Sequence, residues 1–254
     1  MLNRTSWPTR IAPASSTGTR PASSSSVVLT TVKSGSPTRT AVPASTRRSL
    51  TVPVIGAVTA VNPALSSAAA GGAQASFTPD GAQLVVTEKA TGRIDVWPVR
   101  SDGTLGDRAT TASAGPTPFG FAFGRGDALV VSEAAGGAPG ASSVSSYRVG
   151  GDGALAAITA ALPTNETAAC WVVTARGGRL AYTTNAGSRT LGAFTVAADG
   201  RLAPLGSGVA ATLGANPTDA AVLRGVLYAL TPASGEIASF AIARDGALVP
   251  AGSG

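Results

Sequence analysis

The chemistry open to this chain is limited by the reactive side chains that it contains. Its 254 residues include no histidine and a single cysteine, Cys170. A Ser-His-Asp triad, a Cys-His pair, a histidine-ligated metal and an intrachain disulfide are therefore excluded. Carboxylates, arginines, hydroxyls and backbone amides remain, and such groups can activate a water molecule and stabilise an oxyanion.

Two glutamates and two arginines have suitable types and positions for this chemistry. Glu88 in VVTEK and Glu133 in VVSEA follow the same apolar pattern, so we expect them at equivalent ends of two strands. Both are candidate general bases, and Arg93 and Arg189 are candidate contacts for an anion or oxyanion. Polar residues at strand ends also commonly satisfy loop amides or pair with a neighbouring sheet, and this structural role stays open as the alternative.

A pattern of strands and turns recurs four times after residue 65 and would position these residues. Asp-Gly turns fall at Asp102, Asp152, Asp199 and Asp245, with separations of 50, 47 and 46 residues. The second-strand leucines are Leu84, Leu129, Leu180 and Leu227, with separations of 45, 51 and 47. An aromatic residue ends each third strand, at Trp97, Tyr147, Phe194 and Phe240. Asp-Gly pairs supply the positive φ angles of tight hairpins, so consecutive strands should pair antiparallel.

Four antiparallel strands in a unit of about 45–50 residues are typical of a β-propeller blade. An all-β sandwich would also show alternating strands, but it would not keep two markers in register. We therefore predict an all-β propeller with four four-stranded blades in residues 65–254. The expected blades are at about 65–112, 113–161, 162–210 and 211–254.

Residues 1–64 differ in composition from the repeats. The first 50 positions are rich in Ser, Thr, Pro and Arg and contain no acidic residue. Such a segment buries too little apolar surface to offset its chain entropy, so we predict disorder, with a mistaken translation start as a second hypothesis. The stretch TVPVIGAVTAV at 51–61 could supply one extra strand.

The net charge of +6 belongs to that N-terminal segment. Seven of the 19 basic residues lie in the first 50 positions, whereas all 13 acidic residues lie at or after Asp80, which leaves residues 80–254 with a net charge of −1. Phosphate binding needs clustered basic residues, so nucleic acid is not an expected partner. No run of about 18 apolar residues is present, so a membrane is not expected either. The compartment stays open, with the cytoplasm slightly favoured over secretion.

The repeats resemble the lactonase-family β-propellers, which include bacterial 6-phosphogluconolactonase and the fungal carboxymuconate-lactonizing enzymes. The resemblance covers about residues 65–254 and rests on FTPDGAQLVVTEKATGRIDVW, PTPFGFAF, LVVSEAAGG, TAACWVV and LAYTTNAGS. It implies a hydrolase of a sugar lactone or related cyclic ester, with a lactone or sugar-derived ligand as partner. The carboxymuconate branch is associated with a catalytic histidine, and this chain has none to match it.

Family members are seven-bladed rings, so four blades would form a partial ring. We therefore expect self-association through its open ends, or a natural protein longer than this sequence.

Blade geometry predicts that the loop after each second strand and the connector into each first strand share one face. The expected residues of that face are Glu88, Lys89, Arg93, Thr117, Phe119, Glu133, Glu166, Cys170, Trp171, Asn185, Arg189, Thr218, Asp219 and Glu236. Among them we predict that Phe119, Trp171, Asn185 and Asp219 line a ligand-binding face. Cys170 is expected to be a small buried apolar side chain on an inner strand, and not a reactive thiol.

Two alternatives to a cofactor-free lactonase remain. One is a non-catalytic propeller that binds a ligand or protein on this face, or an inactive fragment, because propellers host many functions. The other is a calcium-assisted lactonase with Glu88, Glu133, Asn185 and Asp219 as oxygen ligands, since calcium accepts hard oxygen donors without histidine.

Overall fold

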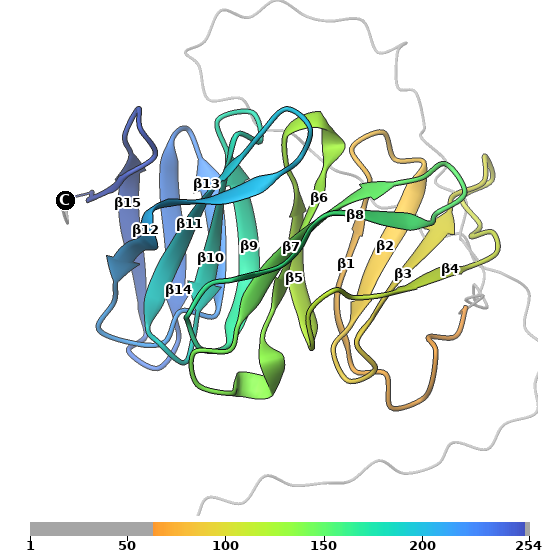
Figure 1. The fold of residues 1–254 in the computed structure, drawn as a ribbon, viewed down its shortest axis with the longest axis horizontal. Helices are drawn as coiled ribbons and strands as arrows, with labels where there is room; N and C mark the ends of the chain where they lie inside the picture. The colour runs from red at the N-terminus through yellow and green to blue at the C-terminus, as the bar shows by residue number, and fades with distance from the viewer. Residues whose placement is uncertain (1–62, 252–254) are drawn as a thin grey trace, which may run out of the picture. The chain divides into compact units, whose positions relative to one another are not determined.

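The computed structural model describes residues 63–251, which form four antiparallel sheets of four strands each (Figure 1). Sheet 1 comprises β1 (Gly72–Phe77), β2 (Gln83–Glu88), β3 (Arg93–Pro98) and β4 (Ala109–Ala112). Sheet 2 comprises β5 (Pro118–Phe123), β6 (Leu129–Glu133), β7 (Ser143–Val149) and β8 (Leu155–Pro163). Sheet 3 comprises β9 (Ala169–Ala175), β10 (Leu180–Asn185), β11 (Thr190–Val196) and β12 (Leu202–Thr212). Sheet 4 comprises β13 (Asp219–Leu223), β14 (Val226–Thr231), β15 (Glu236–Ile242) and β16 (Leu248–Pro250).

Strands pair in the order of the sequence within every sheet, as the hairpin turns predict. Two single 3-10 turns, at Arg125–Asp127 and Ala135–Gly137, are the helical segments of the described chain. None of its helices is long and apolar enough to cross a membrane. The predicted disorder before residue 63 and the extra strand predicted at 51–61 concern residues outside the described part.

The sheets pack face to face in sequence order, and the first strand of each lies against the first strand of the next. Sheets 1 and 2 share a cluster that includes Val85, Ile94 and Leu129, and sheets 2 and 3 share one that includes Phe194. A third cluster, which includes Leu227, joins sheets 3 and 4. Burial of each large apolar side chain in these layers contributes about 1.5–3 kcal/mol.

The register of the strands shows which positions are equivalent between sheets. Leu84, Leu129 and Leu227 lie four residues before the ends of their second strands and pair across to the aromatic residues of the third strands. In sheet 3 this position is Ala181, which pairs with Phe194, whereas Leu180 pairs with Thr195 on the opposite face. The predicted equivalence of Leu180 with the other leucines is therefore wrong by one residue, because neighbouring residues of a strand point to opposite faces.

A left-handed residue precedes the first strand in three of the sheets. Gly71, Thr117 and Ala168 have φ angles of 61°, 60° and 53°. The carbonyl of each accepts a hydrogen bond from the first amide after the second strand, at 3.1, 2.9 and 2.9 Å. Only glycine adopts this conformation without strain, so Thr117 and Ala168 store backbone strain where the chain enters the inner strands.

We predict that Ala168→Gly raises the free energy of unfolding by about 0.5–1 kcal/mol, because relief of the left-handed strain exceeds the extra chain entropy of glycine. Chemical denaturation would measure the change. Ala169→Gly is the matched control: Ala169 is extended and fully buried, so this variant should be less stable than the parent chain. A loss of stability in Ala168→Gly would contradict the prediction.

Candidate functional site

Glu88 and Glu133 occupy the same position in neighbouring sheets. Each is the last residue of a second strand, and both side chains are fully buried. Equivalent positions in sheets 3 and 4 hold Asn185 and Thr231, which are also buried. The repeat therefore buries one polar side chain at this end of every sheet, and each such group needs hydrogen-bond partners.

Both oxygens of the Glu133 carboxylate are occupied by donors within the protein. Oε1 accepts the amide of Gly115 at 2.8 Å and the hydroxyls of Ser113 and Ser145 at 3.0 and 2.6 Å. Oε2 accepts the hydroxyl of Ser143. Ser113 and Gly115 belong to the connector that enters sheet 2, so the carboxylate fixes that connector to β6 and β7. A Cβ on Gly115 would collide with the carboxylate, so only glycine fits there.

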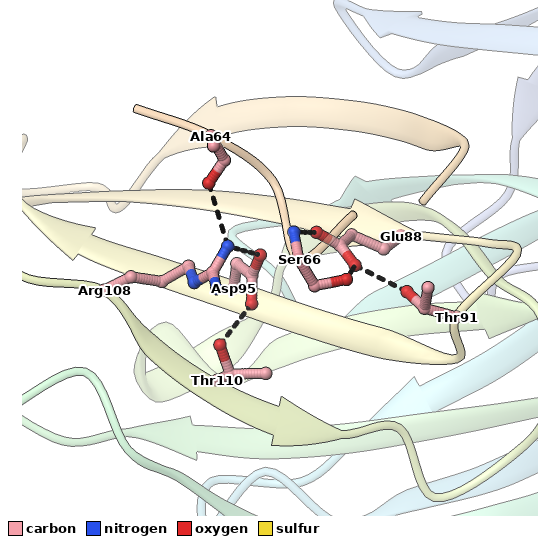
Figure 2. A network of polar contacts seen from close by, with 7 residues as sticks. All are labelled: Ala64, Ser66, Glu88, Thr91, Asp95, Arg108 and Thr110. Carbon is pink, nitrogen blue, oxygen red and sulfur yellow. Dashed lines mark hydrogen bonds and ion pairs between the residues drawn. The ribbon is translucent and has the colours of Figure 1, made fainter. Parts of the chain in front are cut away.

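Glu88 makes the corresponding contacts in sheet 1 (Figure 2). Its Oε1 accepts the amide of Ser66 at 2.7 Å, and its Oε2 accepts the hydroxyls of Ser66 and Thr91. Ser66 lies in the segment that enters β1, as Ser113 and Gly115 lie in the segment that enters β5. Glu88 and Glu133 thus belong to separate networks, and each ties the entry of its own sheet to the second strand.

A second buried carboxylate, Asp95, lies beside Glu88 (Figure 2). Its Oδ1 accepts the hydroxyl of Thr110 at 2.6 Å, and its Oδ2 lies 3.4 Å from Nη1 of Arg108. The same nitrogen of Arg108 donates to the carbonyl of Ala64 at 2.9 Å. Arg108 therefore neutralises one of the two neighbouring carboxylates and holds the segment before β1.

The pKa values of these two carboxyls move in opposite directions. Burial opposes the charge on Glu88, but the hydrogen bonds from Ser66 and Thr91 outweigh it and lower its pKa to about 2. Burial, together with the neighbouring Glu88, raises the pKa of Asp95, although Thr110 and Arg108 oppose that shift. Glu88 is therefore the carboxylate that stays charged, and a group of that kind makes a poor general base near neutral pH.

We predict that Glu88 contributes to acid unfolding. The folded-state pKa of about 2 lies below the ordinary 4.5, so the stabilisation is complete above pH 4.5 and is lost as the pH falls toward 2. In Glu88→Gln, the free energy of unfolding should be lower at neutral pH and should change less between pH 5 and 2. Denaturant titrations at several pH values would measure both quantities. Glu236→Gln, at an exposed glutamate, is the control, and identical pH profiles for Glu88→Gln and the parent chain would contradict the prediction.

The remaining predicted residues have different surroundings. The Asn185 side chain is buried, donates to Thr190 at 3.0 Å and accepts from Thr183 at 3.1 Å, so it is engaged inside sheet 3. Arg93 and Asp219 are exposed at the starts of β3 and β13, and Arg189 is exposed in the turn that precedes β11.

Three side chains from three different sheets converge near the start of the inner strands. Nζ of Lys89 lies 5.0 Å from the centre of the Phe119 ring. The Phe119 ring meets the Trp171 ring edge to face, with ring centres 6.4 Å apart. Lys89 is exposed, and both rings are partly exposed. This Lys89–Phe119–Trp171 cluster combines two apolar ring surfaces with one positive charge, a combination that suits a small ring-shaped ligand with a negative or carbonyl oxygen.

Close contact between β5 and β9 holds the cluster in place. A Cβ on Gly120 would lie 2.7 Å from both the Cys170 carbonyl oxygen and Cα of Trp171, so only glycine permits this approach. The hydroxyl of Ser132 links the two strands through the backbone of Gly120 and the carbonyl of Cys170, at 3.1–3.2 Å. Phe119 and Trp171 are therefore fixed relative to one another by backbone contacts.

The sequence predicted Phe119 and Trp171 as ligand-binding residues and placed Lys89 on the same face without a role of its own. The signal available was its place directly after Glu88, at the end of a second strand. Cys170, which the sequence predicted to be buried, is partly exposed beside the cluster because its strand β9 begins near the surface of this face. Partial burial still raises the pKa of its thiol, which disfavours the reactive thiolate.

Two shallow cavities lie at the turn end of the sheets. The larger, of about 320 Å³, lies between sheet 3 and the Asp245-Gly246 turn, and the smaller, of about 150 Å³, adjoins Asp80 and Gln83. Neither is lined by a predicted site residue. Within residues 63–251, no group of three or more acidic, cysteine or histidine side chains could hold a metal ion.

No protein-family model and no curated protein sequence matches the chain. Solved structures do match. A protein from Bacteroides fragilis, provisionally named 6-phosphogluconolactonase, has a TM-score of 0.59 and 18% identity over 70% of this chain and 53% of its own. The periplasmic gluconolactonase of Pseudomonas aeruginosa has a TM-score of 0.60 and 18% identity over 70% of this chain and 55% of its own. Virginiamycin B lyase from Staphylococcus aureus has a TM-score of 0.52 and 15% identity over 73% of this chain and 56% of its own.

These matches define the class of fold. The chain is an all-β protein built from propeller blades, as the repeats predict, and solved structures of lactonase-type β-propellers resemble it. It spans about half the length of these chains. At identities of 14–18%, the likeness shows the fold and leaves the activity open. A lyase and the hydrazine synthase of Kuenenia stuttgartiensis are also among the structures that the chain resembles.

Proposed function

We propose that this chain binds a small sugar-derived lactone, or the corresponding sugar acid, on the Lys89–Phe119–Trp171 cluster. The observation that carries the proposal is the convergence of one ammonium group and two partly exposed aromatic rings from three sheets. Aromatic rings offer an apolar surface to the C–H groups of a sugar ring. The ammonium of Lys89 can pair with a carboxylate or phosphate, or with the carbonyl oxygen of a lactone.

The ligand class is supported by the names of two fold neighbours, a gluconolactonase and a provisionally named 6-phosphogluconolactonase. Charge also favours an anion at this position. Lys89 is exposed, whereas Glu88 next to it in the sequence is buried, with its carboxylate held by Ser66 and Thr91. A ligand on the cluster would therefore contact the exposed positive charge of Lys89 and not the buried negative charge of Glu88.

Isothermal titration calorimetry with 6-phosphogluconate and with gluconate would test the binding. We expect Trp171→Ala and Lys89→Met each to weaken binding about tenfold, because a stacked ring or an ion pair at such a site contributes about 1–2 kcal/mol. Phe77→Ala and Arg148→Met, which remove an exposed ring and an exposed cation elsewhere, should leave the affinity unchanged. Equal affinities for all four variants, or no binding to the parent chain, would refute the proposal.

Hydrolysis of the lactone is the second candidate function, and the names of the same neighbours favour it. It requires a base that reaches water, with Arg93 or Arg189 as an oxyanion contact. The candidate bases Glu88 and Glu133 are fully buried and hydrogen bonded on both oxygens. Binding needs only the groups that are already exposed, so it is the function that the geometry supports better.

A pH-stat assay with glucono-1,5-lactone separates the two functions. We expect the parent chain to leave the lactone at its spontaneous rate of hydrolysis, because the side chains of both glutamates are buried away from solvent and hydrogen bonded on both oxygens. Acceleration by the parent chain that disappears in Glu133→Gln, with the fold retained by circular dichroism, would instead establish hydrolysis.

A further inference from the structure

The cavity of about 320 Å³ lies between sheets 3 and 4, at the turn end of the molecule. Its volume falls within the usual range for small-molecule sites, about 300–1,000 Å³. Apolar residues of both sheets line most of it, namely Ala193, Leu205, Val209, Ala210 and Leu248. The charged residue of its wall is Asp245. The cavity therefore combines an apolar surface with one carboxylate.

An irregularity in β12 builds one wall of this cavity. Residues 205–208 of β12 stand opposite a single residue of β11, Ala193. In β8, the corresponding strand of sheet 2, at most two residues stand opposite one. Gly206 and Gly208 have left-handed φ angles of 60° and 86°, which glycine adopts without strain. The sequence LGSG at 205–208 therefore encodes the excursion, which places Gly206 and Ser207 in the cavity wall.

The excursion keeps a contact that every junction between sheets makes. A Cβ on Gly153 would lie 3.0 Å from Ala109 of sheet 1, and one on Gly200 would lie 2.6 Å from Ile158 of sheet 2. A Cβ on Gly246 would lie 2.7 Å from Leu205, the first residue of the excursion. Each turn glycine is thus pressed against the sheet before it. The cavity opens beside this contact and does not replace it.

The carboxylate of Asp245 carries a charge that no ion pair offsets within residues 63–251. Its Oδ1 accepts the turn amide two residues further on, at 3.0 Å. Asp199, the equivalent residue of sheet 3, is paired with Arg201 at 3.0 Å. Near Asp245, the guanidinium of Arg176 instead donates to two backbone carbonyls of sheet 4, both at 2.8 Å. Neither Arg176 nor Arg244 lines the cavity, so the charge that a bound ligand contacts is that of Asp245.

We propose that this cavity binds a small aliphatic amine. The ammonium group pairs with the carboxylate of Asp245, and the hydrocarbon part covers Leu205, Val209 and Leu248. Charge complementarity selects this ligand class, because a carboxylate beside an apolar surface favours a cation with an apolar body over an alcohol or an acid. The proposal is independent of ligand binding at the Lys89–Phe119–Trp171 cluster, which lies at the opposite end of the strands.

Nuclear magnetic resonance titrations of the isotope-labelled full chain, at neutral pH, would test the proposal with cyclohexylamine, cyclohexanol and cyclohexanecarboxylate. We expect cyclohexylamine to shift the amide signals of Gly206, Ser207 and Gly246. Its Kd should be about threefold to fivefold lower than that of cyclohexanol, as an ion pair at a partly exposed site allows. Cyclohexanecarboxylate should leave these signals unmoved. An alcohol that binds as tightly as the amine, or an amine that leaves the three signals unmoved, would overturn the proposal.

Asp245→Asn removes the charge and keeps a side-chain oxygen for the turn amide. We expect it to reduce the affinity for cyclohexylamine to that for cyclohexanol, while the affinity for cyclohexanol stays the same. Asp152→Asn is the matched control, because Asp152 accepts its own turn amide at 3.0 Å and does not line the cavity. This control should bind the amine as the parent chain does. Equal affinities of Asp245→Asn and the parent chain for the amine would overturn the proposal.

Ala210→Leu supplies a second readout, because the larger side chain occupies the cavity. It should abolish the binding of both the amine and the alcohol. Ala203→Leu, at an exposed position of the same strand outside the cavity, should leave both affinities unchanged. Binding that survives in Ala210→Leu would overturn the assignment to this cavity. Asp245→Asn changes no packing, so the comparison with Asp152→Asn decides the question if Ala210→Leu fails to fold.

Discussion

Each sheet of this protein has two apolar faces, and both require a neighbour. This requirement arises because successive residues of a strand point to opposite faces and many residues of both sets are apolar. In β6 and β10 every residue is buried, so both faces of these strands are covered. In β14 the burial alternates instead, because no other sheet of residues 63–251 covers one face of sheet 4. The packing of sheet on sheet, with a turn glycine pressed into each junction, fixes the position of everything else in the molecule.

The same packing explains the fate of the two glutamates that first suggested catalysis. A polar group at the end of a second strand is buried once the neighbouring connector is in place, and burial of an unpaired carboxylate would be costly. Serine and threonine hydroxyls and loop amides therefore surround Glu88 and Glu133. The carboxylates in turn hold the connectors that enter the inner strands of sheets 1 and 2.

The candidate ligand site depends on those connectors. Phe119 and Trp171 lie near the starts of β5 and β9, the first strands of sheets 2 and 3. Lys89 directly follows β2, the second strand of sheet 1. None of the three would form a site alone, since the two rings and the charge belong to separate sheets. The proposed recognition of a small ligand at this position therefore depends on the packing of three sheets.

The sequence by itself determined the repeat. Asp-Gly turns, alternating strands and third-strand aromatics are local signals, and they predicted four antiparallel sheets and their class of fold. Phe119 and Trp171 were also predictable, because their place near the start of inner strands follows from the repeat. The repeat spacing misplaced one marker, Leu180, because the leucine of β10 stands one residue before the equivalent position, Ala181, and so points to the opposite face of the strand.

Only the tertiary structure decided which polar residues are accessible. Glu88 and Glu133 have sequence surroundings much like those of exposed strand-end residues, and their carboxylates are held by serines 10 to 22 residues away in the sequence. The approach of Lys89 to Phe119 and of Phe119 to Trp171 likewise depends on contacts between sheets. Local patterns encode hairpins, whereas accessibility and charge at a site are set by the packing of separate sheets, which no single stretch of sequence contains.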